Sequence, residues 1–188
     1  MMTLRAASTA LLAGLFAGLA SPARADQIFV SVKGQLQGDL AGWWNPVDNL
    51  DGVDLSQAGM VDDLAWSVTS PRDAASGLPT GRRLHHPLTL RMRMSTATLQ
   101  LAMAIRNNEN LSELRVRWFV PSAETGANVF TRELLLLNAN VASYSTYTLN
   151  QQGTLVTYVD VAFTYQKIGI HDVSGGVSYE DDWESPIR

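Results

Sequence analysis

The sequence predicts a mainly β protein, a small β-barrel or sandwich of about seven strands with one flanking α-helix. The first observation is a series of short segments in which apolar and polar side chains alternate, which is the period of a half-buried strand. The second is a single stretch, residues 96–106, whose apolar residues follow the period of a helix. The third is size: 188 residues, 46% of them apolar, suffice for one domain with a sizeable core.

The expected strands are spread along the chain and are separated in two places by long loops. In residues 88–94, leucines and methionines take one face of an extended segment, and Arg91 and Arg93 take the other. The loops are residues 34–58, rich in glycine, aspartate and asparagine, and residues 72–81. The remaining expected strands are residues 27–33, 60–69, 113–120, 129–137, 141–149 and 155–170.

The helix is expected at residues 96–106 because Ser95 before it can accept a hydrogen bond from a free backbone N–H of the first turn. Asn107 and Asn108 can end it, since asparagine tolerates the left-handed backbone conformation. The apolar residues gather on one side: Leu99, Ala102 and Met103 share a face, with Leu101 and Ile105 beside it.

The first 25 residues have the pattern of a secretory signal peptide. Arg5 gives a basic start, residues 6–20 form an apolar run, and a small-residue A-x-A ending closes the segment at Ala25. The run is shorter than the stretch of about 20 residues that a membrane-spanning helix needs. We therefore expect cleavage after Ala25, a β-barrel domain at residues 26–170 and a C-terminal tail at residues 171–188.

Charge and composition exclude several classes of function. Loss of Arg5 and Arg24 with the signal peptide leaves 12 of the 14 basic residues against 18 acidic ones, a formal net charge of −6. An acidic domain is a poor match for nucleic acid, whose phosphates attract basic patches. The absence of cysteine excludes disulfides, a thiol nucleophile and cysteine-based zinc sites.

The sequence predicts no metal site. His85 and His86 are adjacent, so an extended backbone points them to opposite faces instead of toward one ion. Asp48, Asp51 and Asp54 are spaced by three and lack the closing glutamate of a calcium-binding loop. We expect these aspartates in a solvated loop.

The sequence also predicts that the protein is not an enzyme and has no cofactor. No G-x-S-x-G motif is present, and Ser174, which precedes two glycines, is expected in a turn. Paired acids such as Asp62 and Asp63 are sequence neighbours that a strand directs apart, which does not fit the geometry of glycoside hydrolysis.

Four residues are candidates for contacts with another subunit or a ligand. Trp43 and Trp44 lie in the long loop, where paired tryptophans either stack on sugars or anchor an interface, or else cap an open end of the barrel. Arg91 and Arg93 share a strand face that we expect to be solvated, with a contact to a neighbouring subunit as the alternative.

Five segments and their order along the chain resemble the haemolysin-coregulated protein (Hcp) family, the tube protein of type VI secretion. The most characteristic is LHHPLTLRMRMSTATLQLAMAIRNNENLSELRVRWF, which combines a histidine, a nearby proline, an alternating strand, a serine-capped helix and a following strand. The resemblance covers most of residues 27–170. The other segments are IFVSVKGQLQGD, residues 60–70 with Trp66 in LAWSVTS, FTRELLLLNANVASYSTYT and VTYVDVAFTYQKIGI.

The resemblance implies a small β-barrel with a flanking helix that joins into hexameric rings, which stack into a hollow tube. In the family, the tube is propelled from a contractile sheath and carries effectors in its lumen, so no catalytic residues are expected. The implied partners are other copies of the chain, secreted effectors and other type VI secretion components, without nucleic acid and without insertion into a membrane.

Two features depart from the family. Family members assemble in the cytoplasm without a secretory signal, whereas residues 1–25 predict export to the periplasm or the medium. A later start of translation would leave cytoplasmic tube assembly before secretion. The loop at residues 34–58 is also longer and richer in tryptophan than in the family. The alternative hypothesis is an exported Hcp-like binding or adhesion module, periplasmic or extracellular, that uses Trp43 and Trp44. A third hypothesis, an exported hydrolase, has no supporting motif.

Overall fold

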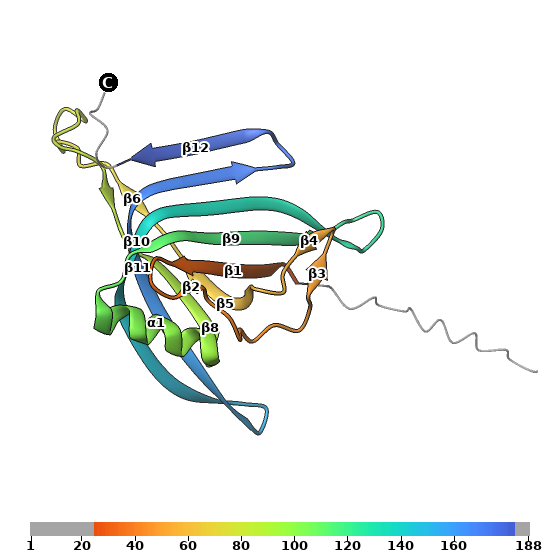
Figure 1. Ribbon diagram of the computed structural model, residues 1–188. Helices are drawn as coiled ribbons and strands as arrows, with labels where there is room; N and C mark the ends of the chain where they lie inside the picture. Colours follow the sequence, from red (N-terminus) through yellow and green to blue (C-terminus); the bar gives the residue numbers. More distant parts are fainter. Residues whose placement is uncertain (1–24, 183–188) are drawn as a thin grey trace, which may run out of the picture.

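The computed structural model describes residues 25–182 and has one antiparallel β-sheet at its centre (Figure 1). The sheet has eight strands, and the predicted fold class, mainly β with one flanking helix, is confirmed. Along the sheet the strands are β10 (Asn128–Gln151), β9 (Leu111–Pro121), β1 (Gln27–Gly34), β5 (Gly59–Ala65), β8 (Leu88–Arg93), β11 (Thr154–Asp172) and β12 (Val177–Asp182), with β2 (Gly38–Asp39) paired to β1.

β10 and β11 are both part of this order of paired strands, and they also pair with each other. This additional pairing closes the sheet on itself. β10 contains two segments that were expected as separate strands, residues 129–137 and 141–149. They join at Asn138, which takes a left-handed conformation (φ 51°) and donates from Nδ2 to Gln166 Oε1 at 2.8 Å. Asparagine tolerates this conformation, so the strand bends here instead of ending.

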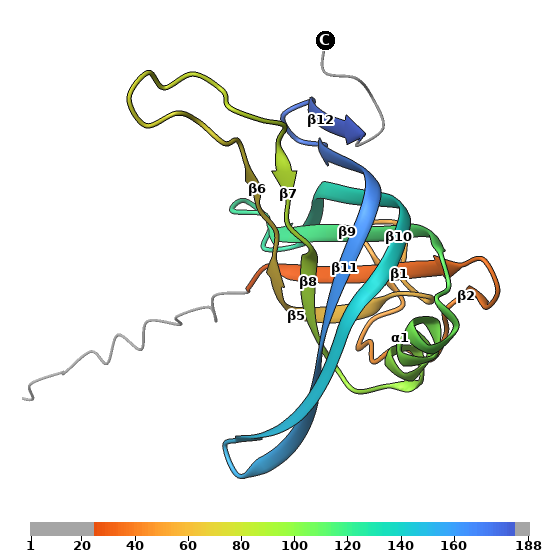
Figure 2. The same ribbon diagram turned by 90° about the vertical axis from the view of Figure 1, so that its left-hand side faces the viewer.

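The far part of the β10–β11 hairpin projects beyond the closed sheet (Figure 1, Figure 2). Its turn residues, Gln152 and Gly153, both have positive φ (49° and 89°), as a two-residue hairpin turn requires. Leu149 and Leu155 flank the turn and are 44% and 72% exposed. We refer to residues 149–155 as the hairpin tip.

Alternate residues of the paired strands fill the interior of the closed sheet, as the alternation in the sequence predicts. Val30, Leu90 and Val161, for example, are at most 1% exposed and belong to one continuous cluster. The side chains between them point outward, and on β10 these include Leu135 and Leu137, which are half-buried. The closed sheet therefore has a packed core and a separate outer face.

The long loop at residues 34–58 folds back on one end of the core. Its Leu55 is fully buried in a second, smaller cluster beside Phe29 and Phe119. These two rings meet edge to face, with their centroids 5.8 Å apart. The loop contains a short hairpin of β3 (Asn49–Leu50) and β4 (Val53–Asp54).

Helix α1 (Thr96–Asn107) lies where the sequence predicts it and is one residue longer at its end. Ser95 accepts a hydrogen bond from the Thr98 backbone N–H, and the Thr98 hydroxyl accepts one from the Ser95 backbone N–H. Asn108 ends the helix in a left-handed conformation, φ 47°. Local sequence therefore determines both ends of the helix.

The helix buries a different face from the one on which its larger apolar residues gather. Leu101 is fully buried, together with Ala97 and Ala104, whose short side chains let the helix lie close to β10. Leu99 and Met103, which share a face in the sequence pattern, are 49% and 50% exposed. Close approach at the alanines leaves these two side chains on the outside.

A long arm, residues 66–87, joins β5 to β8 and projects from the closed sheet (Figure 2). The strand expected at residues 60–69 divides here, because β5 ends at Ala65 and a separate short strand follows. Arg72 and Pro79 form a further bridge within the arm. The two short strands of the arm are β6 (Val68–Thr69) and β7 (Leu84–His85).

The sheet continues past Ile170, where the sequence interpretation placed the start of a C-terminal tail. β11 extends to Asp172, and β12 pairs antiparallel with it along residues 167–172. The acidic end of β12, residues 180–182, has little strand propensity of its own, so it depends on its pairing with β11 for this structure.

The expected signal peptide lies outside the described residues, apart from Ala25. Residues 183–188, the end of the expected tail, also lie outside them. In the described part of the chain, no helix has the length and apolar character needed to span a bilayer.

A buried carboxylate fixes the turn after β1. Glu109, 3% exposed, accepts hydrogen bonds from the backbone N–H groups of Leu36 and Gln37 at 2.8 and 2.9 Å, and from the Gln37 amide at 2.7 Å. Burial raises the pKa of Glu109, but these hydrogen bonds outweigh it and the pKa lies below its usual value. Gly34 faces the carboxylate so closely that a side chain there would have to displace it.

Glu109→Ala is expected to lower the free energy of unfolding by about 2 kcal/mol or more, because several donors lose a charged acceptor in a buried place. Urea denaturation at pH 7 measures the change. Glu124→Ala, at an exposed position, is the matched control and should change stability by less than about 0.5 kcal/mol. Equal stability of Glu109→Ala and the wild type would contradict this role.

Candidate functional site

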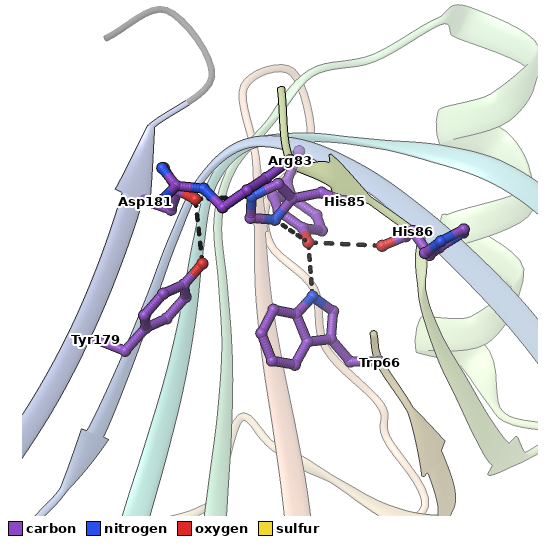
Figure 3. Close-up of polar contacts among 7 residues, drawn as sticks. Trp66, Arg83, His85, His86, Tyr179 and Asp181 are labelled. Atoms are coloured by element: carbon purple, nitrogen blue, oxygen red, sulfur yellow. Dashed lines mark hydrogen bonds and ion pairs between the residues drawn. The ribbon is translucent and has the colours of Figure 1, made fainter. Parts of the chain in front are cut away.

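Polar side chains of the arm meet β11 in a network centred on Tyr165 (Figure 3). The Tyr165 hydroxyl accepts a hydrogen bond from Trp66 Nε1–H at 2.6 Å and lies 3.1 Å from His85 Nδ1. It also lies 3.5 Å from the carbonyl oxygen of His86. Trp66 begins the arm and the histidines end it, so one hydroxyl holds both ends of the arm against the sheet.

Asp181 on β12 is the second centre of this network. Its carboxylate lies 2.9 Å from His85 Nε2, 3.0 Å from the Arg83 guanidinium and 3.1 Å from the Tyr179 hydroxyl. The side chains of His85 and Asp181 are 4% and 11% exposed. Because water is largely excluded, these charge-assisted contacts hold β12 firmly to the arm.

The surroundings shift the pKa values of this network in two directions. Burial raises the pKa of Asp181, but hydrogen bonds from His85 and Tyr179 outweigh it, so the pKa lies below its usual value. Burial and the neighbouring Asp181 carboxylate raise the pKa of Tyr179 to about 12. Burial also raises the pKa of Tyr165. Both tyrosine hydroxyls therefore stay protonated at neutral pH, and the network is suited to clamping the arm.

A second polar cluster joins β8 to the β10–β11 hairpin on the outer face. Arg91 makes two hydrogen bonds to Asp160, at 2.9 and 3.2 Å, and its guanidinium lies 5.5 Å from the centroid of the Tyr147 ring. The Tyr147 hydroxyl donates to the same carboxylate at 3.0 Å. The hydrogen bonds from Arg91 hold the pKa of Asp160 below its usual value. Arg91, a candidate contact residue, is thus engaged within its own chain.

The other three candidate contact residues lie on β8 and in the long loop at residues 34–58. The Arg93 guanidinium lies over the Trp44 ring, 3.9 Å from its centroid, and its Nε is buried without a hydrogen-bond acceptor in residues 25–182. Trp43 packs against the core and donates from Nε1 to the Leu40 carbonyl oxygen at 2.9 Å. The two tryptophans are both partly buried and do not form an exposed pair.

The residues weighed as metal ligands have separate partners. His85 and His86 point apart, as the extended backbone predicts, and His86 Nε2 lies 2.7 Å from the Thr69 hydroxyl. Asp51 of the acidic loop accepts the backbone N–H of Phe130 at 2.8 Å. Within residues 25–182, no group of three or more His, Cys, Asp or Glu side chains is placed to hold a metal ion.

Sequence reasoning misses most of the network around Asp181. Tyr165 falls in an expected strand, but its partners lie in the arm and in the segment expected as a tail. The spacing of Tyr179 and Asp181, two residues apart, places both on one face once that segment is taken as a strand. The missing information is the pairing of β12 with β11.

The fold and its polar clusters define a class of protein: a small closed β-sheet in which networks of polar side chains hold the projecting arm and hairpin in place. Residues 55–171 match the family model described as type VI secretion system effector, Hcp. The chain belongs to this Hcp family, which confirms the resemblance found in the sequence. Family membership associates it with type VI secretion.

Known proteins and solved structures agree with this assignment. The chain is 35% identical over 133 residues to the major exported protein of Pseudomonas aeruginosa strain PAO1, covering 68% of this chain and 76% of the relative. A crystal structure of an Hcp protein has a TM-score of 0.74 at 23% identity, over 85% of this chain and 100% of the other. The secreted protein Hcp3 from Pseudomonas aeruginosa has a TM-score of 0.68 at 23% identity, over 86% and 100%. These structures share the fold of this chain.

Asp181→Asn is expected to loosen the contact between the arm and β12, because a neutral amide loses the charge-assisted contacts to His85 and Arg83. Amide hydrogen exchange at pH 7 should accelerate by about tenfold or more in residues 82–86 and 177–182. Asp39→Asn, an exposed aspartate on β2, is the matched control. Unchanged exchange in both segments would argue against the clamp.

The wild-type clamp should also weaken in acid. Because the pKa of Asp181 is lowered in the folded chain, its stabilising contribution is complete above the ordinary aspartate pKa of about 4. It is lost as the pH falls through the lower pKa of the folded state. Urea denaturation between pH 6 and pH 2 should show a smaller loss of stability in Asp181→Asn than in the wild type, and parallel curves would contradict this origin.

Proposed function

We propose that this chain is a ring-forming subunit of a type VI secretion tube. In this proposal, copies of the chain join into hexameric rings, the rings stack into a hollow tube, and the tube carries effectors alongside other type VI secretion components. The role is mechanical and requires no catalytic residue. The observation that carries the proposal is the match to the Hcp family model over residues 55–171.

The shape of the chain supports this role. Its closed sheet is a compact body, and the hairpin tip and the arm project from opposite ends of it (Figure 1, Figure 2). Each projection is braced by a polar cluster, through Arg91 for the hairpin and through His85 for the arm. Ring closure by head-to-tail contacts needs two different surfaces on each subunit, and braced projections at separate ends are suited to provide them.

We also propose that the chain is exported with cleavage after Ala25, which would place it in the periplasm or outside the cell. The relative named major exported protein supports secretion. Mass spectrometry of the protein recovered from the periplasm and the medium tests the cleavage site. A recovered chain that begins before Asp26 would contradict cleavage after Ala25, and a chain whose translation starts too late to include the apolar run would favour tube assembly in the cytoplasm before secretion.

The alternative of a binding or adhesion module has less support. It requires Trp43 and Trp44 to be available to a ligand, but Trp43 packs against the core and Trp44 lies under Arg93. We therefore retain the tube subunit as the proposed function.

Electron microscopy of the purified chain, residues 26–188, at high protein concentration tests this proposal. We expect six-membered rings, with stacked rings as the concentration rises, because each contact repeats head to tail until the ring closes. Size-exclusion chromatography with light scattering gives the mass of the same sample. A chain that remains monomeric at every concentration would contradict the proposal.

A further inference from the structure

The outer face of the sheet is hollowed where β10, β11 and β12 run side by side. The hollow has a volume of about 470 Å³. Its floor is Gly169, which lies between Leu135 and Glu180 in the strand register. The nearest atom to a Cβ added at Gly169 would be Glu180 Cγ, at 3.9 Å, so the absence of a side chain leaves this space open.

The hollow combines apolar side chains with an available carboxylate. Leu135 and Leu137 are half-buried on its β10 side. Lys167 Nζ lies 2.9 Å from Asp182, so these two charges compensate each other. Glu180 is exposed, and its carboxylate makes no hydrogen bond or ion pair with another residue of the described range 25–182. The hollow is therefore suited to an apolar side chain that arrives together with a cation.

The opposite end of the molecule carries the complementary groups. The hairpin tip and β12 lie at opposite ends in both views (Figure 1, Figure 2). Leu155 is the more exposed of the two tip leucines, at 72%. Arg93 lies beside the tip, where it lines a second hollow with Gln151, Gln152, Thr154 and Val156.

Arg93 has no carboxylate at ion-pair distance in residues 25–182, and its electrostatic interaction with Asp62 only partly opposes the burial that raises the pKa of that carboxyl. The Trp44 ring, whose centroid lies 3.9 Å from the guanidinium carbon, covers the group but accepts no hydrogen bond in the plane of the guanidinium, where its N–H donors lie. The buried Nε has no acceptor, and no ion pair joins Arg93 to a carboxylate among residues 25–182. A planar guanidinium held in this way is suited to bind a carboxylate through two parallel hydrogen bonds.

We propose that the hairpin tip of one copy docks in the Gly169 hollow of a second copy, with Arg93 of the first facing Glu180 of the second. Leu155 then packs against Leu135. Arg93 and Glu180, neither of which has an ion pair within residues 25–182, pair with each other. Because the tip and the hollow are different surfaces at opposite ends, the contact is head to tail and repeats from copy to copy. This inference rests on the proposed function, since it identifies the surfaces that join neighbouring subunits of a ring.

Charge reversal at the two positions tests the pairing. Arg93→Glu places two acids at the contact, and Glu180→Arg places two bases there, so each variant alone should need about a tenfold or higher concentration to assemble. An equimolar mixture should recover rings of the wild-type size, because alternating copies restore an opposite pair at every contact. Electron microscopy and light scattering of the two variants and of their mixture measure the assembly of rings.

Gly169→Val tests the hollow independently of charge. The added side chain fills the floor of the hollow, while strand geometry and the free space at Gly169 accommodate it. We expect a folded chain that does not assemble. Glu124→Arg reverses an exposed charge in the connection between β9 and β10 and is the matched control, which should assemble as the wild type does. Circular dichroism and thermal melting establish that every variant is folded.

The outcomes separate this inference from the proposed function. Rings in the wild type, their loss in both charge variants and in Gly169→Val, and their recovery in the mixture support the contact. Rings that persist in these variants, or a mixture that stays unassembled, overturn the contact and leave the tube proposal intact. A wild-type chain that is monomeric throughout overturns both.

Discussion

The structure depends on the pairing of β10 with β11. One edge of β11 pairs with β10 along its whole length, whereas the other edge pairs first with β8 and then with β12. The pairing with β8 joins the hairpin to the rest of the sheet, so that the β10–β11 pairing closes it around the core, and the pairing with β12 carries the sheet beyond the core. The same two strands continue past β8 in the other direction to form the hairpin tip. One long hairpin therefore provides the wall of the core and also the surfaces at both ends.

Tyr165 lies where β11 exchanges one neighbour for the next. Phe163 is the last residue of β11 paired with β8, and Lys167 is the first residue paired with β12. Between them, this edge of β11 has no strand partner, and the hydroxyl of Tyr165 engages the side chains of the arm instead. Since buried polar groups need partners, these contacts satisfy the Tyr165 hydroxyl and fix the arm to β11 where its pairing with β8 has ended.

Sequence alone predicts the parts of this fold that local interactions determine. The ends of the helix follow from Ser95 and Asn108, and the inner faces of the strands follow from alternation. The strand status of β12 depends instead on its hairpin pairing with β11. The network at Asp181 depends on contacts between residues far apart in the sequence, such as His85 with Asp181. No local pattern contains the contacts of this network, and the acidic residues at the end of β12, which have weak strand propensity, lead to the interpretation of the segment as a tail.

Arg91 and Arg93 show how register decides the role of a residue. They are two residues apart on the same strand face, and in sequence they are equivalent candidates for an external contact. The register of β8 against β11 places Asp160 opposite Arg91 and Tyr158 opposite Arg93. Arg91 therefore obtains a carboxylate inside the chain, and its charge contributes to bracing the hairpin. Arg93 lies over the ring of Trp44 and interacts with Asp62 only electrostatically, without an ion pair. Its buried Nε is therefore left without an acceptor in residues 25–182, and this is the group that the proposed contact between copies uses.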